Sequence, residues 1–522
     1  MGSDLRRPLG VPQGCPKTPE RVSGINRNGC PETPGIAKWT CRTVATIFVK
    51  YDTLTESRVY NSFDPIVRGG FNCGDMGVDT RGKFMEKSKS RRLSLRRYSS
   101  ASSATPAKLL LGLGMLGMVA AACGSAAPAA SSTSSTSGPT ELTVGTLYAG
   151  SGAFASSSLP QLAGLKFWAS QVNQSGGVFV KGLGKKLKVK LVTYNDQSDP
   201  TTAATLYNQL ITQDHVNVLA ADFGSVLTAP AITIAQENHQ LLFDQTGTGA
   251  SFFQSPNPDL VLTALPTSAI WPTPLVQFLL ARHIKNIAVV YCANDFDQSQ
   301  ANTVQSLLKA GGVTPVYFQA VPTTTTDYAS TIQSIKATNP GAVLELGYAN
   351  NDIAFLNDLQ AAGVKFPMTM TVFPTQLPAL LVKDVGAKGL QYTYSYGVPP
   401  ILQRKTVNFG LTFGQFAQAF NGNSTAPINF PSVAGYTTGL VIQDALAHAT
   451  SLSQSAIRAG VSAISGSLKT LDGNFQVNSS GAQLGELLPL AQDLPPIGAS
   501  GSNFQIVYPA AQATASAVYP AP

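Results

Sequence analysis

The sequence predicts an α/β fold of two lobes, each a parallel sheet with helices on both faces. The chain has 522 residues, of which 43% are hydrophobic and 12% charged, which suffices for two or three domains with cores of their own. From residue 141 onwards, short β-branched runs alternate with helical stretches, a pattern typical of parallel strands joined by helices. Because the strands are too many for one ordinary open sheet, we expect two Rossmann-like lobes.

The expected elements follow one another regularly. In the first half, strands are expected at 142–147, 187–194, 216–221 and 241–243, and helices at 158–175, 201–213 and 227–238. In the second half, strands are expected at 286–291, 313–318, 342–346, 368–372 and 389–394, and helices at 297–310, 328–337 and 350–362. Gly-Gly and X-Pro pairs between them mark turns. The segment from about 487 is rich in Pro, Ala and Ser, and we expect a crossover and surface coil there.

The positive charge of the chain lies in its leader. Residues 1–122 hold 19 Lys/Arg and 9 Asp/Glu, a net charge of +10, whereas residues 123–522 hold 17 and 19, a net charge of −2. Binding to a nucleic-acid backbone needs clustered cations. We therefore expect no nucleic-acid partner for the body of the protein.

Residues 85–122 are typical of an export signal. A basic stretch from Met85 precedes an uncharged apolar run at 109–122, which is shorter than the ~20 residues needed to span a bilayer. Small residues then precede Cys123. This ending resembles a bacterial lipobox, in which Cys123 would become the lipidated first residue; an ordinary cleaved signal is the alternative. Arg91-Arg92 resembles a twin-arginine signal or a generic basic region.

The segments on either side of this signal carry no pattern of a folded core. Residues 1–84 are interpreted as a start-site misassignment, with a disordered or cytoplasmic extension as the alternative, because Met85 stands where a signal peptide should begin. Residues 123–140 are rich in Ser, Ala and Pro and are expected to form a flexible tether. After processing, only Cys123 and Cys292 remain, and lipidation of Cys123 would leave no intramolecular disulfide.

Sequence motifs of catalysis are absent. The chain has no nucleophile elbow, zinc-protease helix, Cys-x-x-Cys pair or phosphate-binding loop. Its four histidines have no metal-like spacing: His215, His239, His283 and His448. The sequence therefore predicts no catalytic residue, no metal and no cofactor.

Two loops containing glycine and hydroxyl residues follow the third and fourth expected strands. Residues 221–225 read Ala-Asp-Phe-Gly-Ser, and residues 244–249 read Asp-Gln-Thr-Gly-Thr-Gly. Open parallel sheets bind ligands at the carboxyl ends of their strands, where amides at helix starts can bind a carboxylate. Routine helix capping by Ser225 explains the pattern equally well.

A series of short motifs resembles the leucine/isoleucine/valine-type (type I) periplasmic binding proteins over about 141–475. The motifs occur in order at 150–154, 164–169, 172–178, 196–200, 224–225, 322–328, 339–343 and 435–436. The resemblance implies a two-lobed solute receptor with three crossovers at its hinge, serving an ATP-driven importer. We accordingly assign 141–265 and 397–500 to lobe 1, and 266–396 and 501–522 to lobe 2.

The resemblance also implies a ligand-binding site. By position, it assigns the ligand carboxylate to Ser225, Thr246, Gly247 and Thr248. It assigns an aromatic wall from lobe 2 to Phe296 and Tyr348, for which core packing is the alternative.

The sequence departs from the family where an acid should pair with the ligand ammonium. Residues 373–376 read Phe-Pro-Thr-Gln, without an acid. Asp222, Asp244 and Asp295 are candidates to replace it; otherwise the ligand would be an amide, a urea-like compound or an organic acid, because a buried ammonium without a counter-charge is costly.

Together these observations predict an exported, lipid-anchored, monomeric receptor on the extracytoplasmic face of the cell membrane. It would bind a small polar ligand, either a branched-chain amino acid or a related amide or carboxylate, and deliver it to the permease of an ABC importer. The alternatives are an exported enzyme using the same cleft and a ligand-sensing domain for a signalling partner.

Overall fold

The computed structural model describes residues 138–498 and 500–522. The predicted start-site segment (1–84), export signal (85–122) and lipidated Cys123 lie outside the described residues, as does most of the tether. Within the described part of the chain, no helix is long and apolar enough to cross a membrane.

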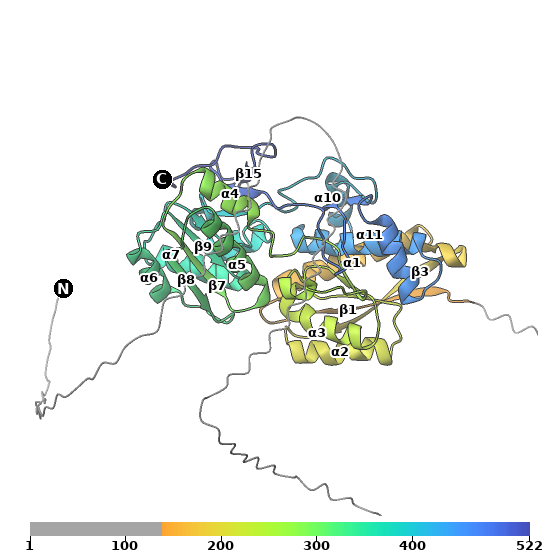
Figure 1. Ribbon diagram of the computed structural model, residues 1–522. Helices are drawn as coiled ribbons and strands as arrows, with labels where there is room; N and C mark the ends of the chain where they lie inside the picture. The colour runs from red at the N-terminus through yellow and green to blue at the C-terminus, as the bar shows by residue number, and fades with distance from the viewer. Residues whose placement is uncertain (1–137, 499) are drawn as a thin grey trace, which may run out of the picture. The chain divides into compact units, whose positions relative to one another are not determined.

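Lobe 1 is built on a six-stranded sheet of order β2-β3-β1-β4-β5-β6. Figure 1 labels β1 and β3 of this sheet. All neighbouring strands are parallel except β2 and β3, which form an antiparallel pair. The strands are β1 (Glu141–Tyr148), β2 (Val178–Val180), β3 (Lys185–Asn195), β4 (Val218–Ala220), β5 (Leu242–Asp244) and β6 (Leu260–Leu262). Neither β2 nor β6 was expected from the sequence; each is a three-residue strand at an edge of the sheet.

The helices of lobe 1 come from two distant parts of the chain. They are α1 (Ala155–Gln174), α2 (Pro200–Thr212), α3 (Gly224–Glu237), α10 (Phe413–Asn421), α11 (Phe430–His448) and α12 (Gln454–Ile464). Helices α1 and α11 pack backbone to backbone, because a Cβ at Gly164 would clash with the carbonyl oxygen of Ser432, and one at Gly435 with that of Gln161. The two glycines therefore allow the returning chain to complete lobe 1. A two-stranded sheet, β12 (Lys469–Thr470) and β13 (Gly473–Asn474), follows α12.

Lobe 2 is built on a seven-stranded sheet of order β15-β14-β11-β10-β9-β7-β8. Figure 1 labels β7, β8, β9 and β15 of this sheet. Its strands are β7 (Ile287–Cys292), β8 (Tyr317–Val321), β9 (Ala342–Leu346), β10 (Thr369–Met370), β11 (Tyr394–Tyr396), β14 (Leu490–Asp493) and β15 (Phe504–Tyr508). Its helices are α4 (Thr273–Ala281), α5 (Asp295–Ala310), α6 (Ala329–Ala337), α7 (Ala349–Ala361), α8 (Pro378–Val385) and α9 (Ala387–Leu390). The strands from β7 to β11 are parallel, so the predicted α/β class of both lobes is confirmed.

The expected lobe boundary at residue 500 is wrong. Strand β14 lies within the segment assigned to lobe 1, yet it pairs antiparallel with β11 in the sheet of lobe 2, with Tyr394 opposite Gln492. The strand is only four residues long and lies between proline-containing coils, so its sequence gives no clear strand signal.

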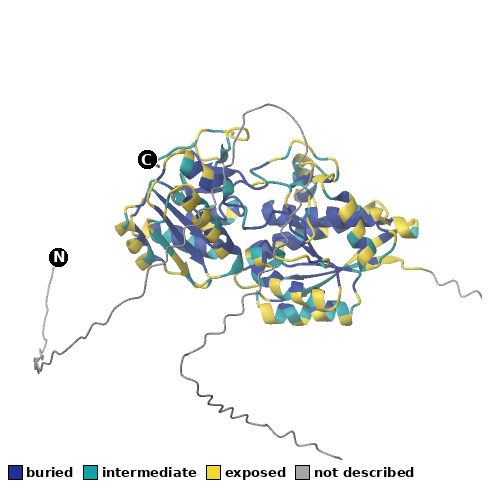
Figure 2. Cartoon of the chain, in the orientation of Figure 1, coloured by how far each residue is buried: buried dark blue, intermediate teal, exposed yellow. Residues whose placement is uncertain are grey.

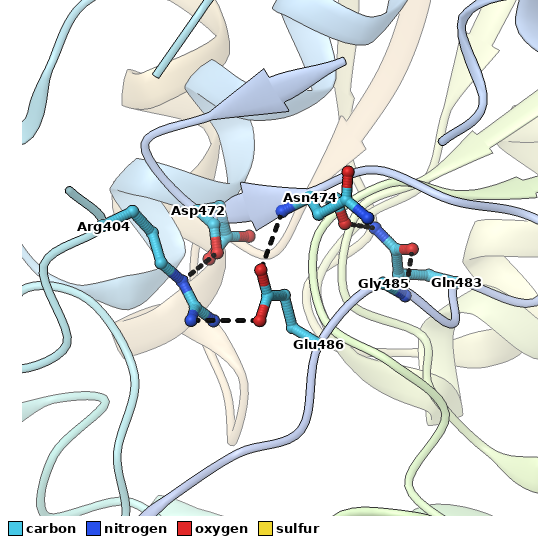
Figure 3. Close-up of polar contacts among 6 residues, drawn as sticks. All are labelled: Arg404, Asp472, Asn474, Gln483, Gly485 and Glu486. Carbon is cyan, nitrogen blue, oxygen red and sulfur yellow. Dashed lines mark hydrogen bonds and ion pairs between the residues drawn. The ribbon is translucent and has the colours of Figure 1, made fainter. Parts of the chain in front are cut away.

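Three crossovers join the two sheets, at 263–272, 397–412 and 475–489. Side chains connect the second crossover to the third (Figure 3). Arg404 forms a 3.2 Å ion pair with Glu486, and its Nε donates to the carbonyl oxygen of Asp472. The other Glu486 oxygen accepts from the backbone N–H of Asn474 at 3.2 Å. The crossovers are therefore tied to each other by polar contacts as well as by the chain.

The central strands of both sheets are buried, whereas β3 and the edge strand β8 are partly exposed, and the outer faces of the helices are exposed (Figure 2). All six residues of β7 are buried, as expected for a parallel strand covered on both faces. Polar loops follow the carboxyl ends of these strands, and in both lobes these loops contribute to a cavity between the lobes.

Candidate ligand-binding site

A cavity lies at the carboxyl ends of the strands, lined by residues of both lobes and of the first crossover. Lobe 1 contributes Phe223, Gly224, Thr246 and Phe430; lobe 2 contributes Phe296, Tyr348, Phe373 and Gln376; the crossover contributes Leu265 and Trp271. The space inside is about 10 Å³, room for about one water molecule. The lobes are thus closed on each other, and a ligand of amino-acid size needs them to separate or the lining side chains to move.

The first turn of helix α3 supplies hydrogen-bond donors to this cavity. The N–H of Gly224 donates to Thr246 Oγ1 at 3.0 Å, and the N–H of Ser225 donates to Tyr348 Oη at 3.2 Å. Gly224 has a φ of +79°, and a Cβ there would lie 3.2 Å from the Tyr348 ring and hydroxyl. The positive end of the α3 dipole therefore faces the cavity, and uncharged hydroxyl oxygens accept hydrogen bonds from the first amides of the helix.

The loop after β5 is held by contacts within lobe 1. Asp244 Oδ1 accepts from the N–H of Gly247 at 2.7 Å and of Thr246 at 3.2 Å. Ser225 Oγ accepts from the N–H of Gly249 at 2.9 Å, which joins this loop to the start of α3. Thr248 Oγ1 is buried and has no hydrogen-bond partner.

The structure brings three of the six predicted ligand-binding residues to the cavity wall: Thr246, Phe296 and Tyr348. The other three, Ser225, Gly247 and Thr248, are not among the lining residues, although Ser225 and Thr248 are buried and Ser225 contacts Tyr348 through its backbone N–H. The role of all six in binding stays a prediction.

Aromatic side chains from both lobes surround the cavity. The Tyr348 ring lies 5.0 Å from Phe154 of lobe 1, 5.3 Å from Phe296 and 5.9 Å from Phe373, measured between ring centres. Trp271 packs edge-on against Phe296 at 5.1 Å. Apart from the loop at 221–225, six residues of this surface were not assigned to a site from the sequence: Phe154, Leu265, Trp271, Phe373, Gln376 and Phe430. A signal existed for Phe154 and Phe373, which lie in the loops after strands.

Each lobe also buries a group of acids near these strand ends. They are Asp196, Asp222 and Asp244 in lobe 1, and Asp297, Glu345 and Asp352 in lobe 2. Loss of water on burial raises the pKa of Asp244 and of Asp352 to about 8. None of the ion pairs within the described residues includes any of the six, so no cation offsets the effect of burial, which raises the pKa of each.

None of the acids that could replace the missing ammonium partner lines the cavity. Asp222 accepts a hydrogen bond from Ser158, and Asp244 accepts the two loop amides. Asp295 Oδ2 accepts from the N–H and Oγ of Ser251 at 3.1 and 2.8 Å. The cavity wall therefore carries hydrogen-bond donors for an anion but no carboxylate. Among the described residues, no group of three or more His, Cys, Asp or Glu side chains is suited to hold a metal ion.

A sequence-family model matches this chain, and its family agrees with the fold described above: two lobes with parallel sheets, three crossovers and a cavity between strand ends. The model describes a periplasmic binding protein, and it matches residues 141–492. The chain belongs to this family. Its members' name implies export from the cytoplasm.

Relatives with curated names are amino-acid-binding proteins. A Leu/Ile/Val-binding protein homolog of Brucella melitensis is 24% identical over 346 residues, covering 62% of this chain and 81% of the relative. The Leu/Ile/Val-binding protein of Escherichia coli is 24% identical over 225 residues, covering 43% of this chain and 59% of the relative. These relatives are binding proteins rather than enzymes.

Solved structures of transporter binding proteins share the fold. A branched-chain amino acid transporter substrate-binding protein from Streptococcus pneumoniae, in complex with isoleucine, matches 71% of this chain and 100% of its own, with a TM-score of 0.59 at 15% identity. A solute-binding protein of an ABC transporter from R. palustris, in complex with benzoate, matches 70% of this chain and 95% of its own, with a TM-score of 0.59 at 16% identity.

Proposed function

We propose that this protein is an extracytoplasmic solute receptor that closes its two lobes over a small ligand, a branched-chain amino acid or a related amide or carboxylate. The observation that carries the proposal is the convergence of the first amides of α3 with aromatic side chains of both lobes on one cavity. Because ligand contacts on both lobes favour the closed form, binding and closure are coupled.

The carboxylate of the ligand would take the place of the oxygens that now accept from Gly224 and Ser225. The Thr246 hydroxyl, which now donates to Gln161 Oε1 at 2.8 Å, would turn to the ligand instead, and Thr248 has a buried hydroxyl still without a partner. Phe296 and Tyr348 would cover the body of the ligand from lobe 2. No covalent chemistry is required, and we infer that the protein is not an enzyme.

Delivery to an ABC importer and anchoring through Cys123 complete the proposal. The relatives named above include binding proteins of such transporters. A monomeric receptor tethered by residues 123–140 at the extracytoplasmic face of the cell membrane would reach a permease in the same membrane. Mass spectrometry of the native N-terminus tests the anchor: we expect an acylated peptide beginning at Cys123, and a peptide from residues 1–84 would contradict it.

A ligand screen tests the receptor itself. The purified protein is heated with a panel of amino acids, amides and carboxylates, and those that raise the melting temperature are titrated by calorimetry. The ligand is then recovered and analysed by mass spectrometry. We expect saturable binding with the ligand unchanged; chemical conversion of the ligand would favour the exported enzyme.

A further inference from the structure

We propose that the cleft selects a carboxylate with an aromatic body and no ammonium group. This inference rests on the proposed receptor function and narrows its ligand class. Three properties of the cavity wall support it: a place for one negative charge, no place for a positive charge, and an aromatic surface between them.

The negative charge belongs at the first turn of α3. The amides of Gly224 and Ser225 already point at oxygens, at 3.0 and 3.2 Å, but these oxygens are the uncharged hydroxyls of Thr246 and Tyr348. A carboxylate oxygen is a stronger acceptor, and the helix dipole favours it. The Thr248 hydroxyl, fully buried and unpaired, lies on the loop that Ser225 holds. It is an additional donor in this region.

A positive charge has no partner at the cavity wall. None of the ten lining residues is acidic, and the most polar side chain from lobe 2 is the amide of Gln376. Taking an ammonium out of water without a counter-charge is costly, and contact with aromatic faces offsets only part of that cost. The acid that follows Phe296, Asp297, is fully buried and absent from the lining; its Oδ2 accepts from the side-chain amide of Asn294, and its Oδ1 has no partner.

The remaining surface suits an aromatic ring. Six of the ten lining residues are aromatic, and they come from both lobes and the first crossover: Phe223, Trp271, Phe296, Tyr348, Phe373 and Phe430. Trp271 and Phe296 meet edge to face, with their planes at 82°. Such edge-to-face contacts extend readily to a further aromatic ring inserted among them.

Matched ligand pairs test the proposal with the full-length protein. Calorimetry compares 3-phenylpropanoate with phenylalanine, 4-methylpentanoate with leucine, and benzoate with benzamide, together with glycine betaine. We expect each carboxylate to bind at least tenfold more tightly than its amino acid or amide counterpart, and 3-phenylpropanoate to bind more tightly than 4-methylpentanoate. Tighter binding of phenylalanine, leucine or betaine would overturn this inference and leave the receptor function standing. If no compound binds, or if one is converted, both fail.

A single substitution in the wall should reverse the preference. Gln376→Glu adds a carboxylate with almost no change of shape at a lining position, so we expect phenylalanine to gain at least tenfold over 3-phenylpropanoate. Gln376→Met keeps the preference for the acid, and its melting temperature reports whether position 376 tolerates change. Gln418→Glu, on the exposed face of α10, adds the same charge away from the cavity and should leave the ratio unchanged. An unchanged ratio in a folded Gln376→Glu protein would contradict the proposal.

Discussion

The hydroxyl of Tyr348 occupies the place that we assign to the ligand carboxylate, and Tyr348→Phe removes only that hydroxyl. The phenol oxygen accepts from the N–H of Ser225 at 3.2 Å and thereby joins lobe 2 to the first turn of α3. The ring itself packs against Phe154 and Phe296, at 5.0 and 5.3 Å, and a phenylalanine preserves both contacts. The substitution therefore separates the hydrogen bond from the aromatic wall.

The expected effect follows from competition for one amide. A hydrogen bond between uncharged groups contributes about 0.5–1.5 kcal/mol net. A carboxylate must displace the Tyr348 hydroxyl before it can use the same N–H, so the bond opposes ligand binding. Without it, the closed form that lacks ligand loses that stabilisation, and the affinity for a carboxylate should rise about two- to tenfold.

Calorimetric titration of wild type, Tyr348→Phe and Tyr348→Ala with 3-phenylpropanoate measures this effect. Tyr348→Ala serves as the comparison, because it removes the ring as well and should weaken binding about tenfold or more. A loss of affinity in Tyr348→Phe would refute the competition, because it would mean that the hydroxyl contacts the ligand rather than standing in its place.

Three further predictions concern the same region. Ser225→Ala leaves the buried N–H of Gly249 without its acceptor, so we expect the free energy of unfolding to fall by about 1–3 kcal/mol and carboxylate binding to weaken about tenfold; an unchanged melting temperature would contradict this. Gly224→Ala forces a φ of +79° on alanine, at a cost of about 1–2 kcal/mol, and presses on Tyr348, whereas Gly414→Ala in helix α10 has open space and should be neutral or stabilising by thermal melting. Burial raises the pKa of Asp244 to about 8 from ~3.9 in an unfolded chain, so between these values the folded state binds more protons than the unfolded state. The melting temperature should therefore fall as the pH rises from 5 to 8, and it should fall less steeply in Asp244→Asn.

The sequence predicted the parallel parts of both lobes best where the strands are buried on two faces. Strand β7 reads as a continuous apolar run, and β9 as an apolar run interrupted only by Glu345. The antiparallel strand β14 could not be found in this way, because it is short and its pairing with β11 depends on a partner about a hundred residues earlier in the chain, at Tyr394–Tyr396. Local periodicity carries no information about such a contact.

The site was predictable only where a residue lies in the loop or the first helical turn directly after a strand. Thr246, Phe296 and Tyr348 satisfy this rule, and they line the cavity. Trp271 and Phe430 reach it from a crossover and from the start of a returning helix, so their place depends on how the lobes meet. The hydrogen-bond partners of the polar side chains could not be predicted either. Nothing in the sequence indicates that Ser225 Oγ accepts from the N–H of Gly249, and this bond changes the effect that we expect Ser225→Ala to have on stability.

The contacts in the closed cleft also determine how well a neutral ligand can compete with a carboxylate for the amides of α3. The amides of Gly224 and Ser225 already have uncharged oxygen acceptors in Thr246 and Tyr348, so an amide or urea-like ligand would exchange one neutral hydrogen bond for another and gain little. A carboxylate exchanges the same bonds for charge-assisted ones, worth about 1.5–3 kcal/mol each, at the positive end of a helix. The affinity of the site is therefore a difference between the ligand's contacts and those the protein makes with itself. Within the amide and carboxylate classes that the sequence left open, this difference favours the carboxylate.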